Sequence, residues 1–347
     1  MPKKKPPQNI LITGVTSQWG LRLAAALCQR NDLHVIGLDT TPPDIPIERL
    51  DFIQADIRNP LLLELLKLEE IHTVYHLAFI ESYRRSEAAF DHNVIGSMKF
   101  LGACAQADVR KIIFKSSTSV YGASPHNPAF LTEMRPIHGS RLYGYNRDLL
   151  EIEAFFNGYR RQYPQITITI LRFANIIGPT VDSPFVRFLS DSMAPVLLGF
   201  DPMVQVIHQD DVHHALLHVL EKDYPGAYNL AAEGILPIFK ILGIVGKTPL
   251  PILHPLAYWS VSAGGPLAEH FPLEPDYLRY RWVADLRLMH ERLAFTPHYT
   301  AEEALREFAG QQRTRPFKPE AASRTYDEER LRDTIERRRR VRAAKGA

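Results

Sequence analysis

Residues 10–20 read ILITGVTSQWG, and this stretch decides the fold. It opens with a short apolar run that stops at Gly14, and from Trp19 to Arg30 apolar residues recur at helical spacing. A buried strand, a polar turn and a helix in this order are typical of the first βα unit of a parallel sheet. The residues therefore predict a strand over 10–15 and a helix over 19–30.

The same alternation continues along the chain. Further strands are expected at 34–39, 52–54, 73–77, 111–116 and 166–173, and helices from residue 60, over 86–108 and over 143–163. Strands that alternate with helices of this length need right-handed crossovers. The expected fold is therefore α/β: a Rossmann-type doubly wound parallel sheet with a smaller C-terminal substrate lobe.

Composition excludes several classes of protein. Of 347 residues, 45% are hydrophobic and 23% charged, which rules out a collagen-like, coiled-coil or wholly disordered chain. Two cysteines, Cys28 and Cys104, cannot form a disulfide framework, which favours a reducing compartment. There is no apolar run of about 18 residues and no signal-peptide pattern. We expect a cytoplasmic protein.

The chain divides into four expected parts. A basic arm, 1–8, precedes the sheet domain, 9–178, and an interleaved lobe, 179–310, in which proline and glycine become frequent. The tail, 311–347, expected to be helical or partly disordered, carries 12 basic and 6 acidic residues, against 29 and 33 in the rest. The basic run suits an anionic partner, but a solvated helix is the favoured interpretation, and no nucleic acid is expected because no nucleic-acid module accompanies the run.

The turn after the first strand favours a dinucleotide. Gly14 and Gly20 have the spacing of the outer members of Gly-x-x-Gly-x-x-Gly, with Ser17 in the middle, so backbone amides and a helix N-terminus can face a pyrophosphate. Alone, this pattern is equally compatible with an ordinary tight turn. Asp39 ends the second predicted strand, where its carboxylate can accept ribose hydroxyls and repel a 2′-phosphate. Together the two features favour NAD over NADP, with Gln18 and Trp19 beside it.

Further motifs follow in a consistent order. They are Asp56-Ile57, His76-Leu77-Ala78-Phe79, Asn93-Val94-Ile95-Gly96, SSTSVYG at 116–122, Tyr143-Gly144-Tyr145-Asn146-Arg147, LRFANIIGP at 171–179, IHQDDV at 207–212, Ala227-Tyr228-Asn229-Leu230 and residues 285–308. Over about residues 9–310 the sequence resembles the extended short-chain dehydrogenase/reductase family, in its NAD-dependent epimerase/dehydratase group.

The resemblance implies site residues and partners. It places Asp56, Ile57, Leu77, Ala78, Phe79, Asn93, Tyr143, Arg147 and Ala174 at the NAD cofactor, and Ser117, Thr118 and Asn175 at the substrate. It also implies a small-molecule substrate, which can be a nucleotide sugar, and a homodimer formed through helices 86–108 and 143–163.

The catalytic group implied is Ser117, Tyr143 and Arg147. A tyrosine, whose ordinary pKa is about 10, acts as a base at neutral pH only beside a positive charge. Arg147 stands where the family has lysine in Tyr-x-x-x-Lys, and its planar fork is not equivalent. Three outcomes are open: a working variant, a slow enzyme, or a protein that binds NAD without turnover.

Two features concern the substrate. Val204 stands where nucleotide-sugar epimerases typically carry an arginine that contacts diphosphate, and Glu274-Pro275-Asp276-Tyr277 replaces an Arg-x-Gly-Asp stretch, which weakens the case for a UDP-sugar. The apolar stretch 235–262 can line a pocket or form a lid, although core packing is the favoured interpretation.

No metal site is predicted. His208, Asp210, Asp211, His213, His214 and His218 are close in sequence. The two aspartates lie where a helix begins and suit an N-cap, and the ligand set is not compact. The main hypothesis is an NAD-dependent epimerase/dehydratase-like oxidoreductase; the alternative is an NAD-binding regulatory or scaffold protein with reduced or lost catalysis.

Overall fold

The computed structural model describes residues 7–81, 85–141, 144–191, 193–262 and 274–314. Residues 1–309 form one compact unit and residues 310–347 a second. Tyr143, most of the basic arm and nearly all of the basic tail lie outside the described residues. Across the described ranges, no helix combines the length and the apolar character needed to span a membrane.

A seven-stranded sheet forms the centre of the first unit. Its strands are β1 (Gln8–Thr13), β2 (Leu33–Asp39), β3 (Leu50–Gln54), β4 (Thr73–His76), β5 (Lys111–Ser117), β6 (Thr167–Phe173) and β11 (Gly226–Leu230). Their order is β11-β6-β5-β4-β1-β2-β3, and every neighbouring pair is parallel. The predicted α/β fold is confirmed. The chain reverses direction across the sheet at β1, which lies between β2 and β4, so a crevice is expected beyond its carboxyl end.

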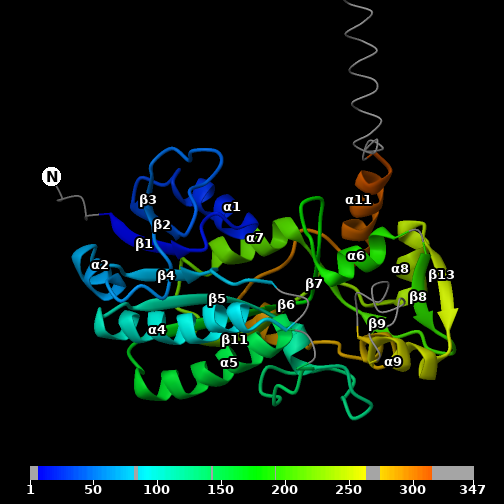
Figure 1. Cartoon of the computed structure of the whole chain (residues 1–347). Coiled ribbons are helices and arrows are strands. Elements are labelled where there is room, and N and C mark those ends of the chain that lie inside the picture. The colour runs from blue at the N-terminus through cyan, green and yellow to red at the C-terminus, as the bar shows by residue number, and fades with distance from the viewer. Residues whose placement is uncertain (1–6, 82–84, 142–143, 192, 263–273, 315–347) are drawn as a thin grey trace, which may run out of the picture. The chain divides into compact units, whose positions relative to one another are not determined.

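Helices cover both faces of the sheet, as Figure 1 shows. One face is covered by α2 (Leu62–Leu68), α4 (Ser97–Gln106) and α5 (Gly144–Gln162), the other by α1 (Gln18–Leu27), α7 (Gln209–His218) and α10 (Arg287–Glu291). Side chains alternate between the two cores: on β5, Ile112 and Phe114 pack on one side and Ile113 on the other. Because both faces are buried, the strands read as continuous apolar runs rather than alternating ones.

The helix predicted over 86–108 is helical but not uniform. It comprises α3 (Glu87–Phe90), a π-helical segment η1 (Asp91–Gly96) and α4. Ser86 caps its start by accepting a hydrogen bond from the backbone amide of Ala89. Single π turns inside helices are frequent at functional sites.

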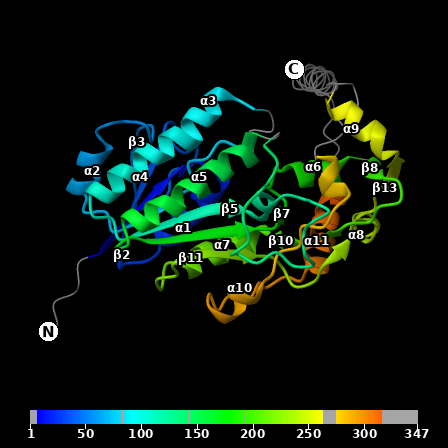
Figure 2. The same cartoon turned by 90° about the horizontal axis from the view of Figure 1, so that it is seen from below.

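The elements of the C-terminal lobe lie together in Figure 2. The lobe has a hydrophobic core of its own. It contains β7 (Asn175–Ile177), α6 (Pro184–Ser190), β8 (Met193–Leu197), β9 (Met203–Val204), β10 (Val206–His208), β12 (Leu236–Pro237), α8 (Ile238–Val245), β13 (Thr248–Ile252), α9 (His254–Ser262), η4 (Pro275–Leu278) and the part of α11 (Ala301–Thr314) that ends at Ala309. Within the apolar stretch 235–262, Ile238 and Ile241 are core residues, whereas Trp259 is 67% exposed.

The N-cap predicted for Asp210-Asp211 is wrong. The capping residue of α7 is His208, whose ring nitrogen accepts from the amide of Asp210, and both aspartates lie in the first turn. The buried histidine ends β10 in extended backbone, which is the conformation that an N-cap requires.

Candidate functional site

The turn after β1 is shaped by two glycines that cannot carry a side chain. Gly14 has a φ of 70°, and a Cβ there would lie 2.6 Å from the backbone nitrogen of Ala78. A Cβ on Gly20 would lie 2.3 Å from the carbonyl oxygen of Gly14. Ser17, in the middle position, is the N-cap of α1: its Oγ accepts from Gly20 N at 3.1 Å and donates to Gly14 O at 2.6 Å. The serine thus stabilises the turn.

Polar groups around this turn fit a dinucleotide. Gln18 Nε2 is buried and has no hydrogen-bond partner among the described residues. At the end of β2, Asp39 Oδ2 accepts from the backbone nitrogen and Oγ1 of Thr16, at 3.0 and 2.6 Å, which fixes the carboxylate beside the turn. A helix N-terminus, a backbone cradle and a placed carboxylate are the groups expected to meet pyrophosphate and ribose.

The other predicted cofactor residues have structural partners. The Asp56 carboxylate is held by Arg58, which lowers the pKa of that carboxyl to about 2. Buried Ile57 packs against Gly96 of the π-helical segment. Asn93 is fully buried and exchanges hydrogen bonds with the backbone of Ile80, at 2.7 and 2.9 Å. Asn93 thereby positions the segment that follows Leu77-Ala78-Phe79.

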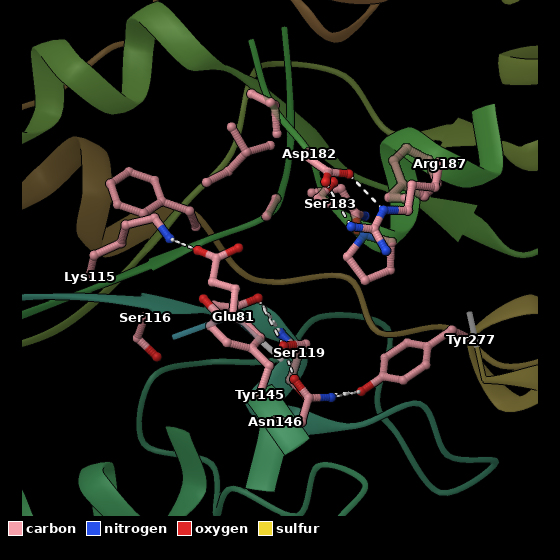
Figure 3. A pocket seen from close by; sticks show the side chains of 18 of the residues that line it. Glu81, Lys115, Ser116, Ser119, Tyr145, Asn146, Asp182, Ser183, Arg187 and Tyr277 are labelled. Atoms are coloured by element: carbon pink, nitrogen blue, oxygen red, sulfur yellow. Dashed lines mark hydrogen bonds and ion pairs between the residues drawn. The ribbon is translucent and has the colours of Figure 1, made fainter. Parts of the chain in front are cut away.

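A cavity opens beyond the carboxyl ends of β5 and β6 (Figure 3). Among the predicted residues, Trp19, Ser117, Ala174 and Asn175 line it, whereas Thr118 is buried in η2 (Thr118–Tyr121) and does not. The remaining lining residues are Glu81, Lys115, Ser116, Ser119, Tyr145, Asn146, Phe173, Ile176, Val181, Asp182, Ser183, Pro184, Phe185, Arg187, Glu274, Tyr277 and Trp282.

Ser117 belongs to a chain of hydrogen bonds in this cavity. Ser119 Oγ lies 2.9 Å from Ser117 Oγ and 2.6 Å from Asn146 Oδ1. Asn146 Nδ2 donates to the hydroxyl of Tyr277 at 3.2 Å, and that hydroxyl donates to the carbonyl of Ser119. Figure 3 shows Asn146 between Ser119 and Tyr277. These hydrogen bonds connect the end of β5 with α5 and with η4 of the lobe.

Among the cavity residues that the sequence analysis missed, Lys115, Glu81 and Tyr145 form one charged group. Lys115 Nζ lies 2.9 Å from Glu81 Oε1, with its side chain 9% exposed, and 5.3 Å from the ring centre of Trp19. The ring of Tyr145 is 6.0 Å from the same ammonium. Burial raises the pKa of Tyr145 to about 12, with the lysine opposing that rise, while Glu81 keeps Lys115 charged by raising its pKa. The sequence signal that could have indicated Lys115 is a lysine that follows apolar residues at the end of a predicted strand.

Arg147 does not line the cavity. Its guanidinium donates to Asp148 Oδ1 at 2.9 Å and to the carbonyl of Ser86 at 3.2 Å. It also lies over the ring of Phe90 at 4.5 Å. The predicted ribose contact is therefore bound to α3 in this structure.

A buried ion pair holds together the elements whose ends form the cavity. Arg172, on β6, donates from Nη2 to Glu153 Oε2 of α5 at 2.5 Å, and both side chains are less than 10% exposed. Ser116 Oγ donates to the same glutamate at 2.5 Å, and Arg172 Nη1 donates to the hydroxyl of Tyr121 at 2.7 Å. The network fixes the ends of β5 and β6 relative to α5.

Among the described residues, more carboxylates than cations line the cavity. Glu81, Asp182 and Glu274 line it, against Lys115 and Arg187. Arg187 donates to both carboxylate oxygens of Asp182, at 2.6 and 2.7 Å. Val204 stands where nucleotide-sugar epimerases typically carry an arginine that contacts diphosphate. Its side chain lies in the lobe core and is 4% exposed.

The fold is a Rossmann-type α/β fold with a cavity at the carboxyl ends of its strands, and comparison with known proteins gives its family. The profile of the NAD dependent epimerase/dehydratase family matches residues 10–231. The chain belongs to this family.

Individual relatives agree with this assignment. The chain is 32% identical over 314 residues to an uncharacterized protein of Mycobacterium tuberculosis, covering 87% of this chain and 83% of the relative. It is 29% identical to a UDP-glucose 4-epimerase of Yersinia pestis, covering 72% and 78%.

Solved structures share the fold. The UDP-glucose 4-epimerase of Thermotoga maritima with UDP-glucose superposes with a TM-score of 0.68 at 22% identity, over 88% of this chain and 99% of that one. The UDP-glucuronic acid 4-epimerase of Bacillus cereus, in complex with UDP-glucuronic acid and NAD, gives the same four values.

Proposed function

We propose that this protein binds NAD at the turn after β1 and uses it to oxidise and reduce a hydroxyl-bearing substrate held in the cavity, as an epimerase, dehydratase or dehydrogenase. The observation that carries the proposal is the continuity of the site: Trp19 lines the cavity and directly precedes Gly20 of the turn. Bound NAD would accept and return the hydride. The chain would supply orientation and proton transfer.

In this proposal Ser117 donates a hydrogen bond to the reacting substrate oxygen, and Tyr143 is the acid/base. Ser117 is suited to its role because it is held through Ser119 at the cavity wall. Lys115 is a buried cation two residues before Ser117 on β5, whereas Arg147 is bound to α3. We propose that the Lys115 ammonium supplies positive charge that the family places on the lysine of Tyr-x-x-x-Lys.

The excess of carboxylates favours a hydroxyl-rich, uncharged reacting group. Carboxylates accept hydrogen bonds from hydroxyls but repel a diphosphate. A nucleotide sugar remains within the proposal if its diphosphate lies on Arg187 and Asn175, which both line the cavity.

A second function is favoured by one observation. The guanidinium of Arg147 is occupied on α3, as expected if the site binds NAD without turnover. The alternative is an NAD-binding regulatory or scaffold protein.

Native mass spectrometry followed by denaturation tests NAD binding first. Retained NAD supports the proposal, and a chain that neither retains nor binds added NAD overturns both functions. A screen of hydroxyl substrates, including nucleotide sugars, then separates them. Tyr143→Phe should abolish turnover and leave NAD bound, and Lys115→Met should lower turnover at least tenfold. The binding-only function predicts no turnover in the native chain or in Arg147→Lys.

A further inference from the structure

A cluster of metal-ligating side chains lies outside the cavity, at the first turns of α7. Asp211 and His214 come from α7, and His298 comes from the segment that precedes α11. One donor atom from each lies within 4.8 Å of the other two. None of the three lines the cavity.

The three donor atoms surround a common point. His298 Nδ1 lies 3.1 Å from His214 Nδ1 and 3.1 Å from Asp211 Oδ1, and the last two atoms are 4.0 Å apart. A triangle with these sides has a circumscribed circle of radius about 2.0 Å, which is the length of a bond from a divalent transition metal to nitrogen or oxygen. An ion at its centre would see the donors at angles of about 100°, 100° and 160°, close to three positions of a tetragonal or octahedral site.

Hydrogen bonding alone leaves this cluster incompletely satisfied. His298 Nδ1 can carry one proton, yet it faces both an imidazole nitrogen and a carboxylate oxygen at 3.1 Å. If Nδ1 of His298 carries the proton, Asp211 and His214 must share one hydrogen bond, and if it accepts from His214, its lone pair faces the carboxylate. A cation in place of the shared proton would satisfy all three donors at once.

The surroundings suit a bound ion. The Asp211 side chain is fully buried and its carboxylate accepts backbone hydrogen bonds from His298 N at 2.7 Å and Tyr299 N at 3.2 Å, which orient it. The side chains of His214 and His298 are 44% and 65% exposed, so an ion can enter from solution and keep water on its open positions. The sequence analysis excluded a metal among residues 208–218 because that ligand set is not compact, and it did not include His298, which is 84 residues from His214.

We propose that Asp211, His214 and His298 bind a divalent first-row transition metal that accepts tetragonal coordination, with Ni²⁺ and Cu²⁺ preferred and Zn²⁺ weaker. The ion would tie the segment that leads into α11 to α7. This proposal is independent of NAD binding and of turnover.

Isothermal titration calorimetry of the untagged, chelator-treated full chain with NiCl₂ tests it. We expect one site of micromolar affinity, at least tenfold weaker in His214→Ala and in His298→Ala and absent in the double variant. His126→Ala, another exposed histidine, should bind as the native chain does. MgCl₂ should give no binding, because Mg²⁺ prefers an all-oxygen site.

Thermal unfolding separates loss of ligands from loss of fold. Both substitutions are at exposed side chains, so the variants should melt near the native temperature without metal. Ni²⁺ should raise the Tm of the native chain and leave that of the double variant unchanged. No saturable binding up to 1 mM Ni²⁺, or binding that survives the double substitution, overturns the site.

Discussion

The Arg172–Glu153 pair gives the sharpest test of how the site is supported. Arg172→Met keeps most of the side-chain volume and removes the charge that neutralises a glutamate 1% exposed to solvent. Breaking a buried ion pair by removing one partner costs about 3–5 kcal/mol. The same change leaves the Tyr121 hydroxyl, whose pKa burial raises to about 12, without its cationic neighbour.

The magnitude is checked by a double-mutant cycle. Arg172→Met alone should lower the free energy of unfolding by about 4 kcal/mol in urea at pH 7. Arg172→Met combined with Glu153→Leu replaces the pair with apolar groups and should lie within about 2 kcal/mol of the native chain. The cause we give is refuted if the first variant loses less than about 1 kcal/mol, or if the double variant loses the sum of the two single ones.

Three further predictions concern backbone, pH and assembly. Gly14→Ala should lower the free energy of unfolding by about 3 kcal/mol and weaken NAD binding, because the backbone of Gly14 has a positive φ and a Cβ there would contact the backbone nitrogen of Ala78. Gly102→Ala is the matched control, because nothing lies within 4 Å of a Cβ at that position, and this variant should be as stable as the native chain or more stable. Burial lowers the pKa of His76 to about 3. The contribution of the neutral ring to stability is therefore complete above about pH 6.5 and falls by about 2 kcal/mol at pH 5. In urea titrations at pH 7 and pH 5, His76→Gln should lose this part of the pH dependence, and an unchanged dependence would contradict the assignment to His76. The dimer implied by the resemblance predicts twice the chain mass in light scattering at micromolar concentration, and a monomeric mass would refute it.

The sequence was most informative where local signals coincide with tertiary structure. The strands β1, β2, β4, β5 and β6 were predicted within a few residues because each is a largely buried apolar run. The partly exposed β3 was predicted over 52–54 and extends over Leu50–Gln54. β1 ends at Thr13, earlier than predicted, because Gly14 takes a positive φ that no strand continues. In the lobe, β9 and β12 have two residues each, too short for any periodicity to reveal.

The site was less predictable because its parts meet only in three dimensions. Lys115 follows three apolar residues and resembles a solvated strand end, whereas its burial depends on Glu81 from the segment after β4 and on Trp19 from α1. The motif gave the position of Arg147 in the sequence, but its partner Ser86, the N-cap of α3, lies 61 residues earlier. A motif specifies where a residue stands in the chain, not which neighbour its long side chain meets.

The aromatic lining of the cavity has a practical consequence for finding the substrate. The chain has three tryptophans, and two of them, Trp19 and Trp282, line the cavity, with the Lys115 ammonium over the first. Indole emission responds to nearby charge and water, so a compound that enters should change the intrinsic fluorescence without any label. Trp259 lies in the lobe, outside the cavity lining, and Trp259→Phe would remove its background. The protein thus carries its own optical reporter, with which compound libraries can be surveyed before any reaction is known.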